Sequence, residues 1–100
     1  MIEYPEEQLK ETVQLLRAIA HELRLQIICH LADGPMNVSD LLSATGVSQP
    51  NLSQHLAKLR MLGILNCERR SQHVFYSLAD PDIKRIVTTL KSVYCPSDKT

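Results

Sequence analysis

The sequence has no excess of charge of either sign. Eleven Lys and Arg residues balance eleven Asp and Glu residues, so the formal net charge of the 100-residue chain is zero. This balance excludes a uniformly cationic nucleic-acid-binding protein, because such a protein would hold phosphates through an overall positive charge. Any nucleic-acid footprint must therefore come from basic residues that are gathered in one part of the chain.

Long apolar runs are also missing. No stretch approaches the roughly 18 apolar residues that a membrane span needs, although 44% of the residues are hydrophobic. The N-terminal residues, MIEYPEEQ, are acidic where a secretory signal peptide is basic. We therefore expect a cytoplasmic protein with no membrane partner, and residues 1–100 are expected to form a single domain without repeats or linkers.

The cysteine spacing of a thiol oxidoreductase is absent as well. The three cysteines, Cys29, Cys67 and Cys95, form no Cys-x-x-Cys pair. His30 follows Cys29 directly, but adjacent side chains on a helix point about 100° apart. That geometry disfavours a catalytic cysteine–histidine pair, and we predict that the protein is not an enzyme.

The segment from Ser48 to Leu62 has the pattern of an amphipathic helix that ends at Gly63. Ser48 can cap its first turn through the hydroxyl, and Pro50 lies where a missing N–H costs little. One face carries a leucine stripe, while the other carries short amide and hydroxyl groups followed by cations. Such groups suit base edges and phosphates. We interpret the segment as a recognition helix, although any amphipathic surface helix shows a similar wheel. The leucines are Leu52, Leu56 and Leu59.

The neighbouring segments strengthen this interpretation. Residues 37–46 form a short apolar stripe between an Asn cap and a C-terminal glycine, directly before the recognition helix. After Gly63, two β-type runs at 64–68 and 73–78 are joined by Arg-Arg-Ser-Gln, which makes a basic hairpin. Residues 37–62 therefore predict a helix-turn-helix, and residues 64–78 predict its wing.

Basic residues are concentrated in the part of the chain that contains the predicted recognition helix and wing. Between Ser48 and His73 four basic residues accompany one acidic residue, whereas the first 36 residues contain three basic and six acidic ones. We predict that this part binds double-stranded operator DNA, with polar groups reading bases and cations holding phosphates. The predicted contact residues are Ser48, Gln49, Asn51, Ser53, Gln54, His55, Lys58, Arg60, Arg69, Arg70 and Gln72.

Three further helices are predicted at about 5–20, 22–32 and 80–94, the last beginning at Asp80–Pro81 and ending before Pro96. The middle one has apolar stripes on two sides, as a helix in the core does. The first and last carry apolar stripes that one small domain leaves uncovered, so we predict a homodimer through residues 5–20 and 80–95. The fold class is then a mainly α winged helix-turn-helix with a small β-hairpin.

Three motifs resemble the ArsR/SmtB family of bacterial winged-helix repressors, and the resemblance covers about residues 15–95. AIAHELRLQII at 18–28 is similar to the family pattern ALAxxxRLxIL, and SQPNLSQHLAKLRMLGIL at 48–65 is similar to SQxxxSxHLxxLxxxGL. VFYSL at 74–78 is similar to VxYxL. The resemblance implies a homodimeric transcriptional repressor that leaves its operator when it senses an inducer.

The wing departs from the family pattern at Glu68. Relatives usually carry a basic residue in this strand, so an acidic side chain there is unexpected. We therefore expect wing contacts to come from Arg69 and Arg70, with Gln72 and His73 beside them.

A metal inducer is not favoured by the sequence. Metal-sensing family members typically use a Cys-x-Cys pair early in the third helix, or Asp/His and His/Glu sets on the last helix. Here residues 38–41 contain no cysteine and residues 80–94 contain no histidine, so we predict neither a metal site nor a cofactor. A metal-responsive repressor stays open as an alternative. The scattered histidines, interpreted as surface or capping residues, are His21, His30, His55 and His73.

Cys29 and Cys95 fall where a thiol-sensing subgroup of HlyU-, BigR- and SqrR-like repressors has its reactive pair, and QIICHL and SVYC resemble that subgroup. The resemblance implies release from DNA when an oxidant or a reactive sulfur species closes a disulfide or polysulfide bridge between them. The residues alone favour another interpretation, in which Cys29 is a small core hydrophobe and Cys95 a tail residue. Cys67 is interpreted as a strand residue that points to the same side as Leu65. A non-enzymatic dimerisation or interaction module is a further alternative.

Overall fold

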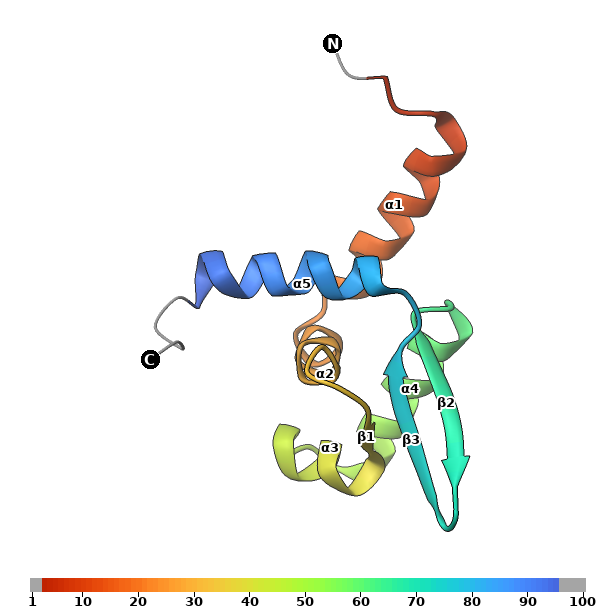
Figure 1. Ribbon diagram of the computed structural model, residues 1–100, viewed down its shortest axis with the longest axis vertical. Helices are drawn as coiled ribbons and strands as arrows, with labels where there is room; N and C mark the ends of the chain where they lie inside the picture. Colours follow the sequence, from red (N-terminus) through yellow and green to blue (C-terminus); the bar gives the residue numbers. More distant parts are fainter. Residues whose placement is uncertain (1–2, 96–100) are drawn as a thin grey trace.

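The computed structural model describes residues 3–95, and within them five helices are combined with one small sheet whose hairpin projects at one edge (Figure 1). This arrangement confirms the predicted winged helix-turn-helix. Pro96, which was expected to follow the last helix, lies outside the described residues. In chain order the elements are α1 (Glu6–Ile19), α2 (Glu22–Leu31), β1 (Met36–Asn37), α3 (Val38–Thr45), α4 (Gln49–Met61), β2 (Leu65–Arg70), β3 (His73–Leu78) and α5 (Pro81–Tyr94).

The turn between α3 and α4 is built by the residues that predicted it. The Asn37 side chain accepts a hydrogen bond from the Asp40 N–H at 2.8 Å, which caps α3. The Ser48 hydroxyl accepts from the Asn51 N–H at 3.4 Å, which caps α4. Between them, Gly46 adopts a left-handed φ of 71°, a conformation that costs glycine little. Helices α3 and α4, which form the helix-turn-helix, are thus joined by a tight turn that the residues in and beside it specify.

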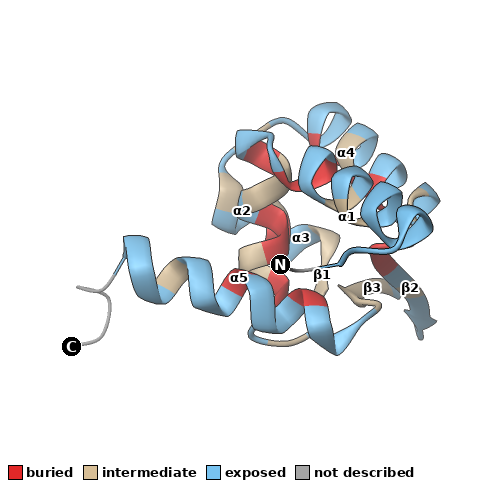
Figure 2. Ribbon diagram, turned by 90° about the horizontal axis from the view of Figure 1, so that it is seen from above, coloured by how far each residue is buried: buried red, intermediate tan, exposed pale blue. Residues whose placement is uncertain are grey.

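Helix α2 lies at the centre of the core. It packs against α1, α3, α4, α5 and β3, and Figure 2 shows buried residues along its length. Ile27 and Ile28, which lie on different sides of α2, are both fully buried. This two-sided burial confirms the prediction made from its two apolar stripes. The leucine stripe of α4 is also buried, and it consists of Leu52, Leu56 and Leu59.

The sheet contains a third strand that the sequence analysis did not predict. Strand β1 pairs antiparallel with β3, and the strand order is β1-β3-β2. Because β1 has only two residues and leads directly into α3, it is too short to show the alternation by which strands are recognised.

The wing hairpin is also longer than predicted. Arg69 and Arg70, expected in the connecting loop, pair with Val74 and His73 as the last residues of β2. Only Ser71 and Gln72 form the turn, and Ser71 has a positive φ of 58°. A two-residue turn with this handedness matches the twist of paired strands, so pairing continues to the end of the hairpin.

The terminal helices extend away from this core (Figure 1). Their apolar stripes lie on the surface: the exposed fraction is 54% at Leu16 of α1 and 59% at Val93 of α5. No helix in residues 3–95 combines the length and the apolar character needed to cross a bilayer. A monomer thus leaves two apolar helix faces in water.

Candidate DNA interface and thiol pair

The outer side of α4 carries the residues predicted to read bases. Every one of them is exposed, whereas the leucines on the opposite side are buried. Their amide, hydroxyl and ammonium groups can reach base edges and phosphates without rearranging the core. Ser48 is exposed as well and keeps its capping bond. We call the following residues the reading face: Gln49, Asn51, Ser53, Gln54 and Lys58.

His55 departs from this outward arrangement. It is half-buried, and its ring lies 4.4 Å from the ring of His21, centroid to centroid, at an interplanar angle of 42°. His21 caps α2, since its Nδ1 accepts from the Leu23 N–H at 3.2 Å. Burial lowers the pKa of His55, and the nearby His21 and Arg24 lower it further. His55 therefore favours the neutral state and joins the start of α2 to α4.

Arg60, in the last turn of α4, lies near enough to the sheet to influence Tyr76. Burial raises the pKa of the Tyr76 phenol and neighbouring Cys67 raises it further, while the Arg60 guanidinium opposes both effects. Cys67 stands opposite Tyr76 in the β2–β3 ladder and is half-buried on the side of buried Leu65, as the strand alternation predicts. Arg60 is exposed and follows Ser53 by seven residues, about two helical turns, so it lies on the same side of α4 as Ser53. Its contact with DNA stays a prediction.

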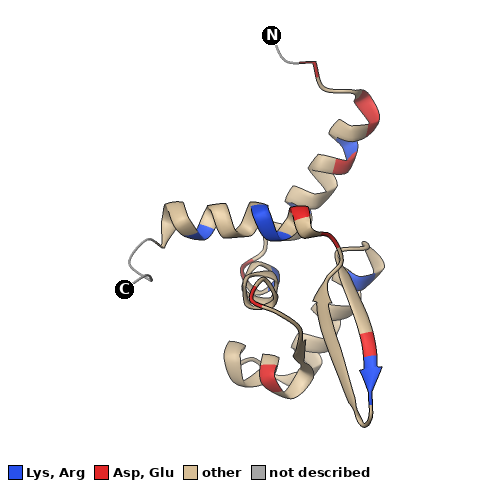
Figure 3. Cartoon of the chain, viewed as in Figure 1, with Lys and Arg blue, Asp and Glu red and all other residues tan. Residues whose placement is uncertain are grey.

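The wing places its cations at the far end of β2. Figure 3 shows an acidic residue directly before basic ones in this strand. Arg70 Nη2 lies 3.3 Å from Glu68 Oε1, and its guanidinium carbon lies 5.2 Å from the centroid of the Phe75 ring. Arg69 and Gln72 are exposed. Because Glu68 neutralises part of the charge of Arg70, the departure from the family pattern bears directly on the wing.

The two cysteines of the predicted pair lie on helices that pack together, α2 and α5. Cys29 is half-buried near the end of α2, and Cys95 is exposed at the C-cap of α5. Burial raises the pKa of the Cys29 thiol; Lys91 opposes this, whereas Cys95 and Asp33 raise it further. Lys91 and Cys95 therefore lie near enough to Cys29 to influence its thiol, and all three thiols of the chain are free.

Comparisons with known proteins match this geometry. A family model described as bacterial regulatory protein, arsR family, matches residues 21–66, from the cap of α2 into β2. The transcriptional activator HlyU of Vibrio cholerae is 42% identical over 89 residues, which cover 89% of this chain and 82% of that relative. The chain belongs to the ArsR family.

Solved ArsR-type structures share the whole fold. HlyU from Vibrio cholerae N16961 superposes with a TM-score of 0.87 at 42% identity, over 91% of this chain and 99% of that one. A structure of reduced HlyU from the same strain gives a TM-score of 0.85. The transcriptional repressor BigR of Xylella fastidiosa gives 0.84 at 33% identity, over 90% and 92% of the two chains. The relatives are transcriptional regulators and not enzymes, which confirms the predicted class of function.

Donor sets for a metal are not found in the part of this ArsR-family chain that the structure describes. No group of three or more His, Cys, Asp or Glu side chains gathers closely enough to hold an ion. His30 and His73, in particular, lie on different elements, α2 and β3.

The sequence analysis did not single out two residues near the outer side of α4 in this ArsR-family protein, Arg24 of α2 and Met61 at the end of α4. Arg24 and Met61 line one hollow together with Gln54, His55 and Lys58. Arg24 lies within the motif AIAHELRLQII, but its contact with α4 depends on how α2 and α4 pack. A sequence pattern that describes one helix at a time does not contain this information.

Proposed function

We propose that the protein is a homodimeric repressor that binds operator DNA and is released when Cys29 and Cys95 are oxidised or bridged by a reactive sulfur species. The observation that carries the switch is the packing of α2 against α5, which brings Cys95 near enough to Cys29 to influence its thiol. The reading face of α4 carries the DNA-binding part of the proposal.

The DNA-binding part is supported by how α4 is anchored. Three leucines fix one side of the helix in the core, so the reading face is presented on a rigid element. Hydrogen bonds from side-chain amides distinguish base pairs in the major groove, where a helix fits. The wing adds Arg69 and Arg70, whose charges suit phosphates beside the groove.

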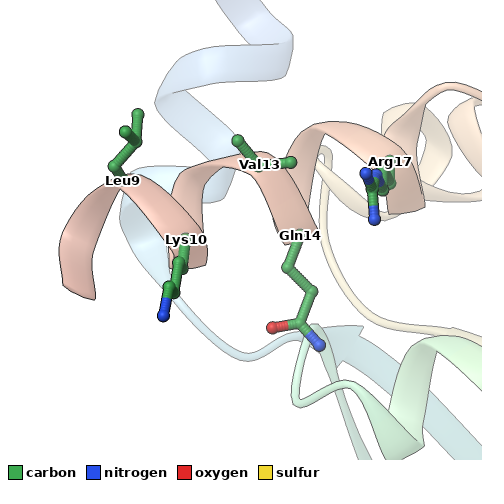
Figure 4. A pocket seen from close by; sticks show the side chains of 5 residues that line it. All are labelled: Leu9, Lys10, Val13, Gln14 and Arg17. Atoms are coloured by element: carbon green, nitrogen blue, oxygen red, sulfur yellow. The ribbon is translucent and has the colours of Figure 1, made fainter. Parts of the chain in front are cut away.

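The homodimer is supported by the uncovered faces of the terminal helices. Leu9 and Val13 project from one side of α1 (Figure 4) and line a surface hollow of about 480 Å³. A second hollow, of about 490 Å³, lies along Ile86 and Leu90 of α5. Twofold pairing of these faces would remove them from water and would set two reading faces about one DNA turn apart, as helix-turn-helix dimers do.

The chemistry of the switch follows from the different exposure of the two thiols. Exposed Cys95 is accessible to an external polysulfide: its thiolate attacks one sulfur, an S–S bond breaks, and a shorter sulfide anion leaves. The Cys29 thiol then loses its proton to solvent, and its thiolate attacks the mixed polysulfide on Cys95. It expels a second sulfide fragment and leaves a bridge between the cysteines. Together the two thiols lose two electrons and two protons, and the polysulfide is reduced.

Two physical consequences follow. A direct disulfide needs Cα atoms within about 7 Å, whereas a longer sulfur chain spans more. In either form, the bridge ties α5 to α2, and α2 also packs against α3 and α4. In the proposed dimer, α5 lies in the interface. If α5 shifts relative to α3 and α4, the spacing of the two recognition helices changes and many DNA contacts weaken at once.

The decisive experiment measures operator affinity by mobility shift, with the upstream region of the protein's own gene as the probe. Wild type, Cys29→Ser and Cys95→Ser are compared in the reduced state and after treatment with a polysulfide donor, and Cys67→Ser is the matched control. We expect wild type and Cys67→Ser to release DNA on treatment and the other two to stay bound. Release of both Cys29→Ser and Cys95→Ser would place the switch elsewhere. Failure of the reduced wild type to bind DNA would instead favour a dimerisation module.

A kinetic measurement tests the order of the two attacks. Because burial raises the pKa of Cys29, less of its reactive thiolate is present at neutral pH, and its fraction grows about tenfold per pH unit below that pKa. We expect mass spectrometry to detect a sulfur adduct on Cys95 before the bridge forms, and the delay before closure to shorten as pH rises toward the raised pKa of Cys29. A first adduct on Cys29 would contradict the assigned order.

A further inference from the structure

A hollow of about 380 Å³ lies between the start of α2 and the outer side of α4. Three of its lining side chains can carry a positive charge, and none of them is acidic. We call it the cationic hollow. Its lining residues are Arg24, Gln54, His55, Ala57, Lys58 and Met61.

Arg24 is held in a fixed position at the wall of the cationic hollow. Its Nε donates to the Ala18 carbonyl at 2.7 Å and its Nη2 donates to the Arg17 carbonyl at 3.3 Å, both at the end of α1. A guanidinium has five N–H donors, so these two bonds leave others for a ligand. The hollow therefore contains a cation whose orientation is already set.

His55 is the group in the cationic hollow whose charge can change near neutral pH. His21 and Arg24 of α2 face its ring, and Lys58 lines the same hollow from α4. All of these neighbours are basic, and burial further lowers the pKa of His55. An anion in the hollow would reverse this balance and favour protonated His55.

We infer that the cationic hollow is the seat of one phosphodiester group of the operator duplex, next to the bases that the reading face contacts. The inference rests on the proposed function, because DNA must lie along α4 for its backbone to reach the hollow. Gln54 and Lys58 belong both to the reading face and to the lining of the hollow, so the two surfaces are continuous. Arg24 supplies oriented N–H donors, Lys58 a point charge, and His55 a donor that takes up a proton.

Proton uptake gives this site a signature that other phosphate contacts lack. The pKa of His55 lies below its usual value in the free protein and is raised when the phosphodiester binds. Since the complex then holds more protons than the free protein, affinity for DNA rises as pH falls through this range. Linkage sets the limit at about a tenfold gain in affinity per pH unit for one proton.

The test is fluorescence anisotropy of a labelled operator duplex with the reduced protein over a series of pH values. Wild type is compared with His55→Gln, and His30→Gln on α2, outside the predicted DNA contacts, is the matched control. We expect wild type and His30→Gln to gain affinity with falling pH more steeply than His55→Gln, by up to about tenfold per unit. Equal pH slopes for all three proteins would overturn the inference while leaving the proposed function intact. Absence of any operator binding by reduced wild type would overturn both.

An NMR titration of the wild type makes the test independent of any variant. The pKa of His55 is read from its ring signal in the free protein, with operator DNA, and with inorganic phosphate alone. We expect DNA to raise this pKa and inorganic phosphate to leave it nearly unchanged at the same concentration. An equal rise of the pKa with inorganic phosphate would show a small-anion site and not a DNA contact. No rise with DNA would exclude binding of a phosphodiester group in the cationic hollow.

Discussion

Helices α4 and α5 have almost the same length, 13 and 14 residues, but they divide their side chains differently. In α4 the leucines of the stripe are all buried, and what remains outside is mainly polar or basic, with Met61 at the end of the helix as the large apolar exception. In α5 only Ile83 and Val87 are buried, and the outer side still carries Leu90, Val93 and Tyr94, the last of them 77% exposed.

This difference indicates which kind of partner each helix surface can bind. Exposed amides and cations on α4 are stable in water and bind a polar, anionic partner without a large desolvation cost of apolar surface. An apolar stripe on α5 gains free energy only when another apolar face covers it. Since α1 presents the same kind of stripe, a second copy of the chain would supply the matching surface in the proposed dimer.

The largest effect is expected where a charge is placed on the α5 stripe. In the proposed dimer, Leu90→Glu buries one unpaired carboxylate per subunit, each costing about 3 to 5 kcal/mol, and twofold symmetry puts both in the same interface. We expect monomers in sedimentation velocity experiments and loss of operator binding. Thr88→Glu, on an exposed part of α5, is the control and should stay dimeric. A folded Leu90→Glu dimer would remove the distinction between the two helices.

Next in size is truncation of the α4 stripe. Leu56 is 1% exposed, and Leu→Ala at such a site costs about 2 to 5 kcal/mol of unfolding free energy. We expect Leu56→Ala to lower the melting temperature by an amount that does not depend on protein concentration. Leu90→Ala should instead give a shift that depends on concentration, because its contacts are intermolecular. Ser53→Ala on the reading face should change stability by less than about 0.5 kcal/mol, and a larger loss would mean that this face is packed.

A smaller effect is expected from single contacts to DNA, and here the kind of loss matters more than its size. Gln54→Ala should cost about 1 to 3 kcal/mol at the base it reads and flatten the preference among operator variants. Arg70→Ala should weaken binding to all sequences alike and reduce the salt slope by about one. Affinities for a panel of operator variants at several salt concentrations separate the two. Unchanged preference in Gln54→Ala would remove α4 from base readout.

The sequence predicted the local features of this structure better than the features that depend on packing between distant segments. Features that depend on neighbouring residues were predicted: the caps at Asn37 and Ser48, Gly46 in the turn, and the leucine stripe of α4. Helical periodicity and capping chemistry act within a few residues, so they are readable from the chain.

Features that depend on packing between distant segments were missed. Strand β1 exists because residues 36–37 meet β3, almost 40 positions later. Likewise, His21 and His55 meet because α2 and α4 pack together. The sequence predicted surface or capping histidines, and His21 does cap α2, but the contact between the two rings was not predicted. Arg24, which closes the cationic hollow, carries no local signal of that role.

The smallest effect is expected at Glu68, where the wing differs from the family pattern. Its carboxylate lies 3.3 Å from Arg70, and both side chains are more than half exposed. Exposed ion pairs contribute about 0 to 1 kcal/mol, so Glu68→Gln should hardly change stability.

Its effect on DNA binding should nevertheless be measurable. Glu68→Gln removes a negative charge that would face the phosphate backbone and releases Arg70 from its partner, while the Phe75 ring still supports the guanidinium at 5.2 Å. We expect affinity for all operator variants to rise by a few-fold, about 0.5 to 1 kcal/mol, with a steeper salt dependence. Glu68→Gln combined with Arg70→Ala should keep only the part of this gain that comes from removing the acidic charge. If Glu68→Gln binds DNA no more tightly than wild type at low salt, the wing does not contact phosphate through Arg70, and base readout by α4 would account for the interface without it.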